Sequence, residues 1–250
     1  MIELPLAIVC DGVRLAGGIV VPDEPRGSCI LLHGIPSILP PEPGDTGYPG
    51  LAGRFAAEGW AAAWVDMRAV RGSKGSFSIE GWVRDARTTI DAVRSTEGTH
   101  GLPLALIGSS AGGAVACEIA ARGAPVDALA MLAAPASWTW FAANPVAGAQ
   151  RIAQDSGMVL SEEVLADPTA WAAEFDAVSP ERSIVKVKVP TLIIHGTSDD
   201  VVPVHHAELL RERAPRAEVR IIEGASHHLR KDETALETLF DWLDRTLARR

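Results

Sequence analysis

The 250-residue chain contains 47% hydrophobic and 22% charged residues, a balance typical of soluble globular proteins and unlike that of disordered chains. Its 32 acidic residues outnumber its 23 basic residues, and the formal charge of -9 argues against a nucleic-acid partner, whose phosphates require clustered positive charge. We therefore expect a single domain over residues 1–250, the usual arrangement for an α/β chain of this length.

The sequence also argues against a membrane-bound or disulfide-bonded protein. No apolar run reaches membrane-spanning length, and residues 1–10 lack the basic start and long apolar stretch of a secretory signal. Cys10, Cys29 and Cys117 are odd in number and lack C-x-x-C spacing, which favours buried free thiols over disulfides or a zinc site. We expect a cytoplasmic protein with no membrane partner.

The order of the predicted elements indicates an α/β fold. Residues 2–10 and 13–21 flank an Asp11, Gly12 turn and predict an antiparallel hairpin. From residue 29 onward, short apolar runs alternate with longer helical patterns, which predicts a mostly parallel twisted sheet of about eight strands flanked by helices. Several runs lack polar alternation, so we expect them to be buried on both faces. The predicted strands are 29–32, 61–65, 104–107, 129–132, 191–194 and 219–222, and the predicted helices are 51–58, 79–94, 111–122, 205–213 and 232–247.

Residues 136–180 interrupt the alternation of strands and helices. This segment follows a predicted strand, supplies no obvious strand and is rich in aromatic residues, so we expect a short helical cap inserted over the sheet. Its rings favour an apolar acyl or aryl group in a substrate pocket. The alternative is that they only hold the cap on the sheet. The candidate pocket residues are Trp138, Trp140, Phe141 and Trp171.

A G-x-S-x-G motif occupies residues 108–112, directly after the strand predicted at 104–107 and at the start of the helix predicted at 111–122. A sharp turn between strand and helix leaves no room for side chains two residues before and after the serine, and its strained backbone exposes the serine itself. Ser110 is therefore the candidate nucleophile. The alternative is a glycine-rich connection in which the serine only caps the helix.

With this motif in place, the chain resembles the α/β-hydrolase family, in its esterase and serine aminopeptidase-like branch, over almost its whole length. His33 and Gly34 look like the oxyanion-loop dipeptide of that family. The resemblance implies that the backbone N–H groups of Ile35 and Ala111 face the developing oxyanion. Residues 66–75 resemble a further stretch of the family pattern, D-x-R-G-x-G-x-S-x-G.

This last stretch departs from the family at Ala69 and Arg71, which stand where the family has glycines. The usual role of the stretch is structural. The departures therefore do not affect the triad, but they leave the shape of the pocket wall open.

Two further segments resemble the parts of the family that complete a catalytic triad. Residues 195–203 are similar to the strand end that carries the triad acid, which implies Asp199, with Asp200 as the alternative. Residues 224–227 match the loop that carries the general base, which implies His227, with His228 as the alternative. The order of serine, acid and histidine along the chain is the one expected of this fold.

The resemblance implies acyl transfer through an acyl-enzyme intermediate. We expect a serine hydrolase of small to medium uncharged carboxylic esters, because the cap segment carries Arg151 as its one basic residue against six acidic ones, a balance that disfavours strongly anionic substrates. No step needs a cofactor, and no histidine spacing suggests a metal. The alternatives are a peptidase or amidase on the same triad and a ligand-binding, non-enzymatic member. A homo-oligomer is compatible with the sequence, although nothing in it indicates one.

Overall fold

The structure, a computed structural model, describes residues 1–247. Within these residues nine strands form one sheet in the order β1-β3-β5-β4-β6-β7-β8-β9, and β2 also pairs with β3. In chain order the strands are β1 (Ile2–Pro5), β2 (Ile8–Cys10), β3 (Val13–Val21), β4 (Gly27–Leu32), β5 (Trp60–Asp66), β6 (Leu104–Ser109), β7 (Ala128–Leu132), β8 (Thr191–Gly196) and β9 (Glu218–Ile222). Strands β4 to β9 are parallel, whereas β1, β2 and β5 pair with β3 in antiparallel fashion.

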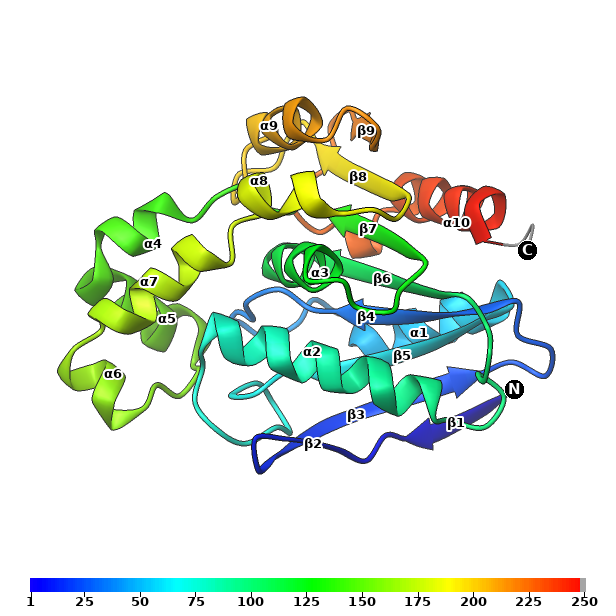
Figure 1. Ribbon diagram of the computed structural model, residues 1–250, viewed down its shortest axis with the longest axis horizontal. Helices are drawn as coiled ribbons and strands as arrows, with labels where there is room; N and C mark the ends of the chain where they lie inside the picture. The colour runs from blue at the N-terminus through cyan, green and yellow to red at the C-terminus, as the bar shows by residue number, and fades with distance from the viewer. Residues whose placement is uncertain (248–250) are drawn as a thin grey trace.

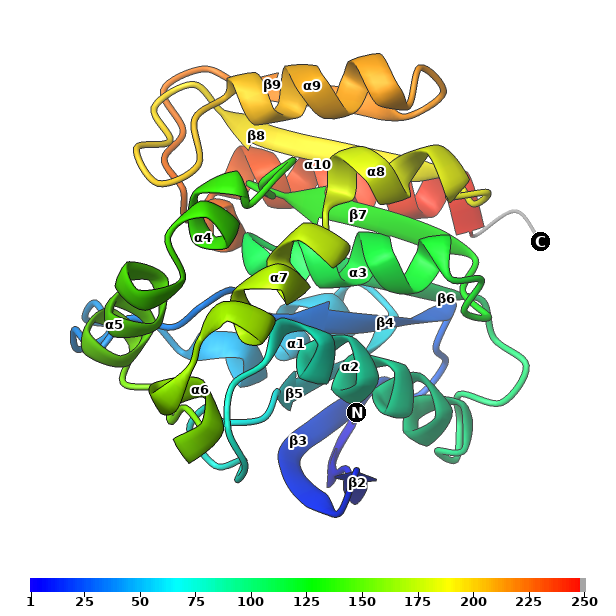
Figure 2. The ribbon, with the colours of Figure 1, turned by 60° about the vertical axis from the view of Figure 1, so that its left-hand side comes forward.

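Helices cover both faces of this sheet (Figures 1 and 2). In chain order they are α1 (Gly47–Ala57), α2 (Ile79–Arg94), α3 (Ala111–Ala121), α4 (Thr139–Ala143), α5 (Pro145–Ser156), α6 (Glu162–Ala166), α7 (Thr169–Ala177), α8 (Pro180–Ser183), α9 (His205–Arg213) and α10 (Glu233–Leu247), with two 3-10 turns, η1 (Ile184–Lys186) and η2 (Leu229–Lys231). Apolar side chains of α2, α3 and α9 bury one face of the sheet, and those of α1 and α10 bury the other. The predicted fold class is confirmed.

Burial of the strands follows from this layering. Strands β4, β7 and β8 are buried at every position because helices lie on both of their faces. Strand β9 differs, since it is the edge strand and exposes Arg220 and Ile221. The expectation that unalternated apolar runs are buried on both faces therefore holds for the inner strands and not at the edge. The three cysteines are free and buried, as expected.

Residues 136–180 form helices α4 to α7 and the first residue of α8, beyond the carboxyl ends of the parallel strands (Figures 1 and 2). The two ends of this segment are joined, because the Glu181 N–H donates to the Ala136 carbonyl at 2.9 Å and the Trp138 indole donates to the Val178 carbonyl at 2.6 Å. Glu174 of α7 accepts a hydrogen bond from Ser78, the N-cap of α2, at 2.7 Å. The segment is thus fastened to the helix layer as well as to its own stem.

The start of α3 lies against the end of β4 with almost no space between the two backbones. A Cβ added at Gly112 would overlap the Leu32 carbonyl and lie 2.5 Å from the His33 oxygen, and one added at Gly108 would overlap the backbone at Gly112 and Gly113. Backbone cannot move aside as a flexible side chain can. The two glycines of the G-x-S-x-G motif are therefore required by close packing.

We expect Gly112→Ala to destabilise the fold by about 3 kcal/mol or more, because the new methyl group has no direction in which to relax. The matched control is Gly53→Ala in α1, where an added Cβ meets nothing within 4 Å. That change should stabilise the protein by about 0.5–1 kcal/mol by removing a helical glycine. Urea denaturation at pH 7 measures both, and equal stability of the two variants would contradict the packing argument.

Candidate active site

Ser110 occupies the turn between β6 and α3 in a strained conformation, with φ 54° and ψ -123°. Non-glycine residues rarely adopt positive φ, and holding one there costs about 1–3 kcal/mol. The turn is held by hydrogen bonds from Ser110 N–H to the Leu132 carbonyl at 2.8 Å and from Gly113 N–H to the Ser110 carbonyl at 2.9 Å. On the other side lies Gly34, where a Cβ would sit 2.8 Å from the Ser110 Cβ. The serine is thus pinned between two neighbouring strand ends.

Asp199 and His227 are in direct contact. The Nδ1 atom of His227 lies 2.8 Å from Asp199 Oδ2 and 3.0 Å from Oδ1. The Asp199 carboxylate is buried, and its Oδ1 also accepts backbone hydrogen bonds from Val201 at 3.0 Å and Val202 at 2.7 Å. These bonds compensate the cost of burying the charge. Because Nδ1 faces the carboxylate, Nε2 is the nitrogen left to accept a proton.

The two alternative residues lie outside this contact. Asp200 is exposed, and so is His228, whose ring centroid lies 6.0 Å from that of His227. Among the hydrogen bonds of residues 1–247, none joins Ser110 Oγ to His227. Catalytic hydrogen bonds are often long before substrate binds, so this separation does not exclude proton transfer. Ser110, Asp199 and His227 follow the carboxyl ends of β6, β8 and β9, respectively.

Two backbone amides beside Ser110 have no acceptor. The N–H groups of Ile35 and Ala111 donate to no group in the described part of the chain. Ala111 is the first residue of α3, so its amide also lies at the positive end of a helix dipole. These are the two donors that the family resemblance implies for an oxyanion. Both are available to donate to one.

His33 orients the backbone that leads to Ile35. Its Nε2 accepts a hydrogen bond from Met67 N–H at 3.0 Å, so Nδ1 carries the proton and donates to the Gly34 carbonyl at 2.7 Å. The ring is buried and packs edge-on against Trp82 at 5.0 Å between centroids. Burial lowers the pKa of His33 to about 4, so the imidazole is neutral at physiological pH.

The loop before α1 is tied to the segment that follows His227. Asp45 accepts two hydrogen bonds from Arg230, at 2.9 and 2.5 Å, and Glu42 pairs with Lys231 at 2.7 Å. The Arg230 guanidinium also lies over the Tyr48 ring at 5.5 Å. Hydrogen bonding to Arg230 holds the pKa of Asp45 far below its usual range, and burial raises the pKa of Tyr48 to about 12. Sequence reasoning missed these residues, because no motif links two loops so far apart in the chain.

The stretch 66–75 has a glycine-like backbone despite its two departures from the family pattern. Ala69 and Arg71 both have positive φ, 65° and 44°. Arg71 pairs with Asp66 at 3.0 Å, and the Ser73 hydroxyl accepts a hydrogen bond from Ala16 N–H at 2.8 Å. These contacts hold the loop in a conformation that its side chains disfavour. The backbone is therefore glycine-like even though Ala69 and Arg71 stand where the family has glycines.

The aromatic residues of segment 136–180 pack mainly against one another. Phe175 stacks on Phe141 at 4.7 Å between centroids and contacts Trp171 at 4.9 Å and Trp138 at 5.5 Å. Trp138 and Trp171 are buried, whereas Trp140 is 45% exposed and lies against the Arg151 guanidinium. These contacts are the ones that the packing alternative predicts. Phe141 is half-buried and retains some accessible surface.

Within residues 1–247, no group of three or more His, Cys, Asp or Glu side chains is arranged to hold a metal ion. No helix of that span is long and apolar enough to cross a membrane.

The open parallel sheet, the strained serine after β6 and the Asp199–His227 contact together define the α/β-hydrolase class. The chain belongs to the serine aminopeptidase S33 family, whose model matches residues 23–166.

Curated relatives match parts of the chain. It is 47% identical over 55 residues to α/β hydrolase domain-containing protein 17C of Xenopus tropicalis, which covers 22% of this chain and 18% of that protein. It is 27% identical over 193 residues to the uncharacterized protein YfhR of Escherichia coli, covering 72% of this chain and 61% of that one. The chain thus spans about a fifth of the first relative and less than two thirds of the second.

Solved structures share the fold over nearly the whole chain. Est1E of Butyrivibrio proteoclasticus with bound ferulic acid superimposes with a TM-score of 0.72 at 19% identity, covering 97% of this chain and 99% of that one. The Pyrococcus furiosus esterase Pf2001 has a TM-score of 0.72 at 18% identity, covering 98% and 91%. The esterase domain of a Rhodothermus marinus protein has a TM-score of 0.72 at 19% identity, covering 99% and 100%.

The burial of neutral His33 predicts acid sensitivity. Its folded pKa of about 4 lies below the value of about 6.5 expected in the unfolded chain, so the unfolded state binds the proton first as the pH falls. The contribution of His33 to the free energy of unfolding should be fully present above about pH 6.5. It should be lost between about pH 6.5 and 4, by up to about 3 kcal/mol. His33→Asn, which cannot titrate, should show a smaller change in urea midpoint between pH 7 and 4.5.

The exposed His100 provides the control, since His100→Asn should keep the wild-type pH dependence. An unchanged pH dependence in His33→Asn would show that the acid sensitivity arises elsewhere.

Proposed function

We propose that the protein hydrolyses small to medium uncharged carboxylic esters through an acyl-enzyme on Ser110. The observation that carries the proposal is the buried Asp199–His227 contact of 2.8 Å, at the sheet edge where Ser110 has a strained backbone. A carboxylate against Nδ1 fixes the tautomer in which Nε2 is a base.

The reaction proceeds in two acyl-transfer steps. His227 Nε2 takes the hydroxyl proton as Ser110 Oγ attacks the ester carbonyl, and Asp199 stabilises the imidazolium. The amides of Ile35 and Ala111 hold the oxyanion of the tetrahedral intermediate. His227 then protonates the departing alcohol. It next takes a proton from the water molecule that attacks the acyl-enzyme carbonyl, and it returns this proton to Ser110 Oγ as the acid is released.

The charges around the site favour an uncharged substrate. Arg230 is bonded to Asp45, and Arg71 is bonded to Asp66. Lys231 is paired with Glu42. An anionic substrate would have to compete with these internal carboxylates for each cation, so the site offers little net attraction to a charged group.

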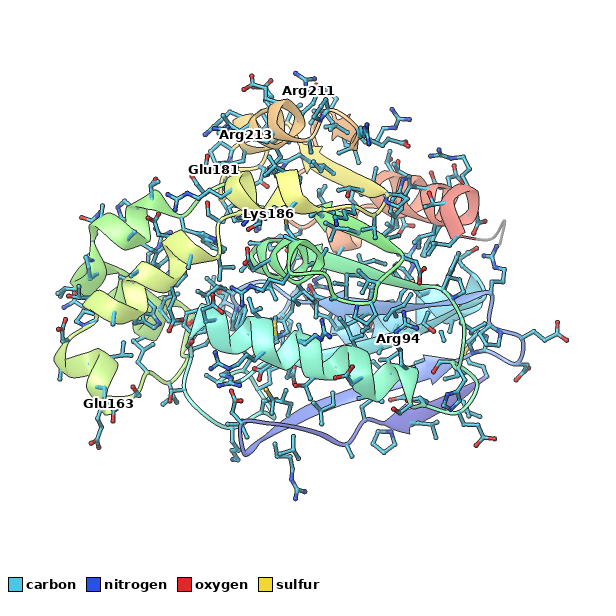
Figure 3. The ribbon with its side chains drawn as sticks, in the orientation of Figure 1. Arg94, Glu163, Glu181, Lys186, Arg211 and Arg213 are labelled. Atoms are coloured by element: carbon cyan, nitrogen blue, oxygen red, sulfur yellow. The ribbon has the colours of Figure 1, made fainter. Side chains whose placement is uncertain are left out.

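An ester is favoured over the amino-terminal amide that the family description suggests. An aminopeptidase needs a free carboxylate for the substrate ammonium group, and two acidic residues of segment 136–180 already have other partners. Glu174 binds Ser78 and the Glu80 N–H, and Asp176 pairs with Arg182. Glu163 of α6 points away from the sheet (Figure 3). The esterases among the structural neighbours support the same preference.

Replacement of Ser110 by alanine should abolish hydrolysis of p-nitrophenyl esters, by at least about 10³-fold in kcat, because no other nucleophile is expected to form the acyl-enzyme. A series from acetate to palmitate measures it, and we expect turnover to peak at short to medium chains. Ser226→Ala, an exposed serine beside His227, is the control and should retain activity. Ester hydrolysis that survives in Ser110→Ala would refute the proposal.

Aminoacyl arylamides are assayed alongside. Turnover comparable with that of the esters would establish the aminopeptidase alternative on the same triad. Tight ligand binding without repeated turnover would indicate a binding protein.

Two pairs of neighbouring residues test the remaining roles. Asp199→Asn should lower kcat by about 10³–10⁴-fold, because a neutral amide neither stabilises the imidazolium nor fixes the tautomer. His227→Gln should have an effect at least as large. Their exposed neighbours provide the controls, since Asp200→Asn and His228→Gln should stay within about twofold of wild type. Inactivation by Asp200→Asn with an active Asp199→Asn would reassign the acid.

A further inference from the structure

His195, near the end of β8, lies beside the Asp199 carboxylate. Its side chain is completely buried, and its Nε2 atom is 2.7 Å from the Val202 carbonyl oxygen and 3.3 Å from Asp199 Oδ2. Both neighbours are acceptors, so Nε2 carries the proton; its N–H donates to the Val202 carbonyl, and the Asp199 carboxylate lies beside it. Asp199 therefore contacts two imidazoles, those of His195 and His227.

The hydrogen bond to Val202 closes a short ring of interactions. The Val202 N–H donates to Asp199 Oδ1 at 2.7 Å, while the Val202 carbonyl accepts from His195. His195 thus holds the residue whose amide holds Asp199. Backbone amides fix Oδ1 from one side, and the two imidazoles face Oδ2 from the other, so the plane of the carboxylate is determined.

The other ring nitrogen of His195 indicates why an imidazole is present. Nδ1 is buried and has no hydrogen-bond partner in the described part of the chain. Burying a bare acceptor costs about 1–3 kcal/mol. An apolar side chain would fill the same space without that cost. The benefit of histidine at this position must therefore come from Nε2.

His195 also stays neutral. A second proton would create an N–H at Nδ1 with no acceptor, and burial lowers the pKa of the group. It can thus lie against Asp199 without adding a second positive charge that would compete with the imidazolium of His227.

We propose that His195 is a positioning residue, whose Nε2–H holds the Val202 peptide, and through it the Asp199 carboxylate, in the orientation that directs Oδ2 at His227 Nδ1. The catalytic part of this inference rests on the proposed function. His195 touches neither substrate nor reacting atoms and acts only through Asp199.

Two substitutions distinguish the effect of the His195 hydrogen-bond donor from the effect of its packing. His195→Leu fills much of the space without a donor, whereas the amide nitrogen of His195→Gln can donate near the position of Nε2. The control is His206→Leu, because His206 also bonds the backbone, accepting from Ala136 N–H at 3.0 Å, but does not touch Asp199. Thermal unfolding of all three variants identifies any change that acts only through stability.

With the best ester substrate, His195→Leu should lower kcat by about 10–100-fold and leave KM within about twofold, since a misdirected base slows chemistry without weakening binding. His195→Gln should recover most of this loss, and His206→Leu should keep the wild-type kcat. A folded His195→Leu with wild-type kcat, or a His195→Gln as slow as His195→Leu, would overturn the proposal.

A second readout needs no substrate. The ¹⁵N chemical shifts of the His227 ring, assigned with His227→Gln, report its tautomer at neutral pH. We expect the Nδ1–H tautomer in wild type and His195→Gln, and a mixture in His195→Leu. If wild type hydrolyses no ester, the proposed function fails, yet this result still decides the role of His195. A pure Nδ1–H tautomer in His195→Leu, or a mixture already in wild type, would overturn it.

Discussion

The close approach of α3 to the end of β4 is the constraint on which the site depends. Gly112 lies against the Leu32 and His33 carbonyls, so the chain can pass from β6 into α3 only through a sharp turn, and Ser110 takes the strained conformation in it. The cost of that strain is offset by burial of nearly all of α3 between the sheet and its neighbours. A serine held in this way is half-buried and fixed at its backbone, and the free Ala111 amide follows directly after it.

The second requirement is electrostatic. A buried carboxylate such as Asp199 is stable only if hydrogen bonds replace its lost hydration. Two backbone amides and His227 supply them here, and the Nε2 atom of His195 lies 3.3 Å from the same carboxylate. His33, which is also buried and neutral, performs the comparable task for the Gly34 backbone. Three histidines near the site thus make distinct ring contacts, which their positions in the sequence do not reveal.

Much of the fold could be predicted because inner strands are continuous apolar runs and the packed helices have an apolar face, as in α10. The Ser110 turn was predictable because its glycines are a steric necessity. Asp199 could be distinguished from Asp200 only by its spacing from Gly196, against which the Ala225 carbonyl packs too closely for any side chain. The pairing of Asp45 with Arg230 could not be predicted, since the two residues are 185 positions apart and lie in segments without periodicity. The positive φ of Ala69 and Arg71 could not be predicted either, because surrounding contacts impose it against the preference of the residues themselves.

The ion pairs between the loop before α1 and η2 have an evolutionary consequence. The loop at residues 34–46 contains Ile35, the proposed oxyanion donor, and η2 follows His227, the proposed base, so Asp45 and Arg230 join two segments of the proposed site. Substitutions in the two segments share partners and should combine non-additively. A lineage that remodels the first loop for a new alcohol group would therefore need compensating changes around η2, and the two segments should diversify together rather than independently.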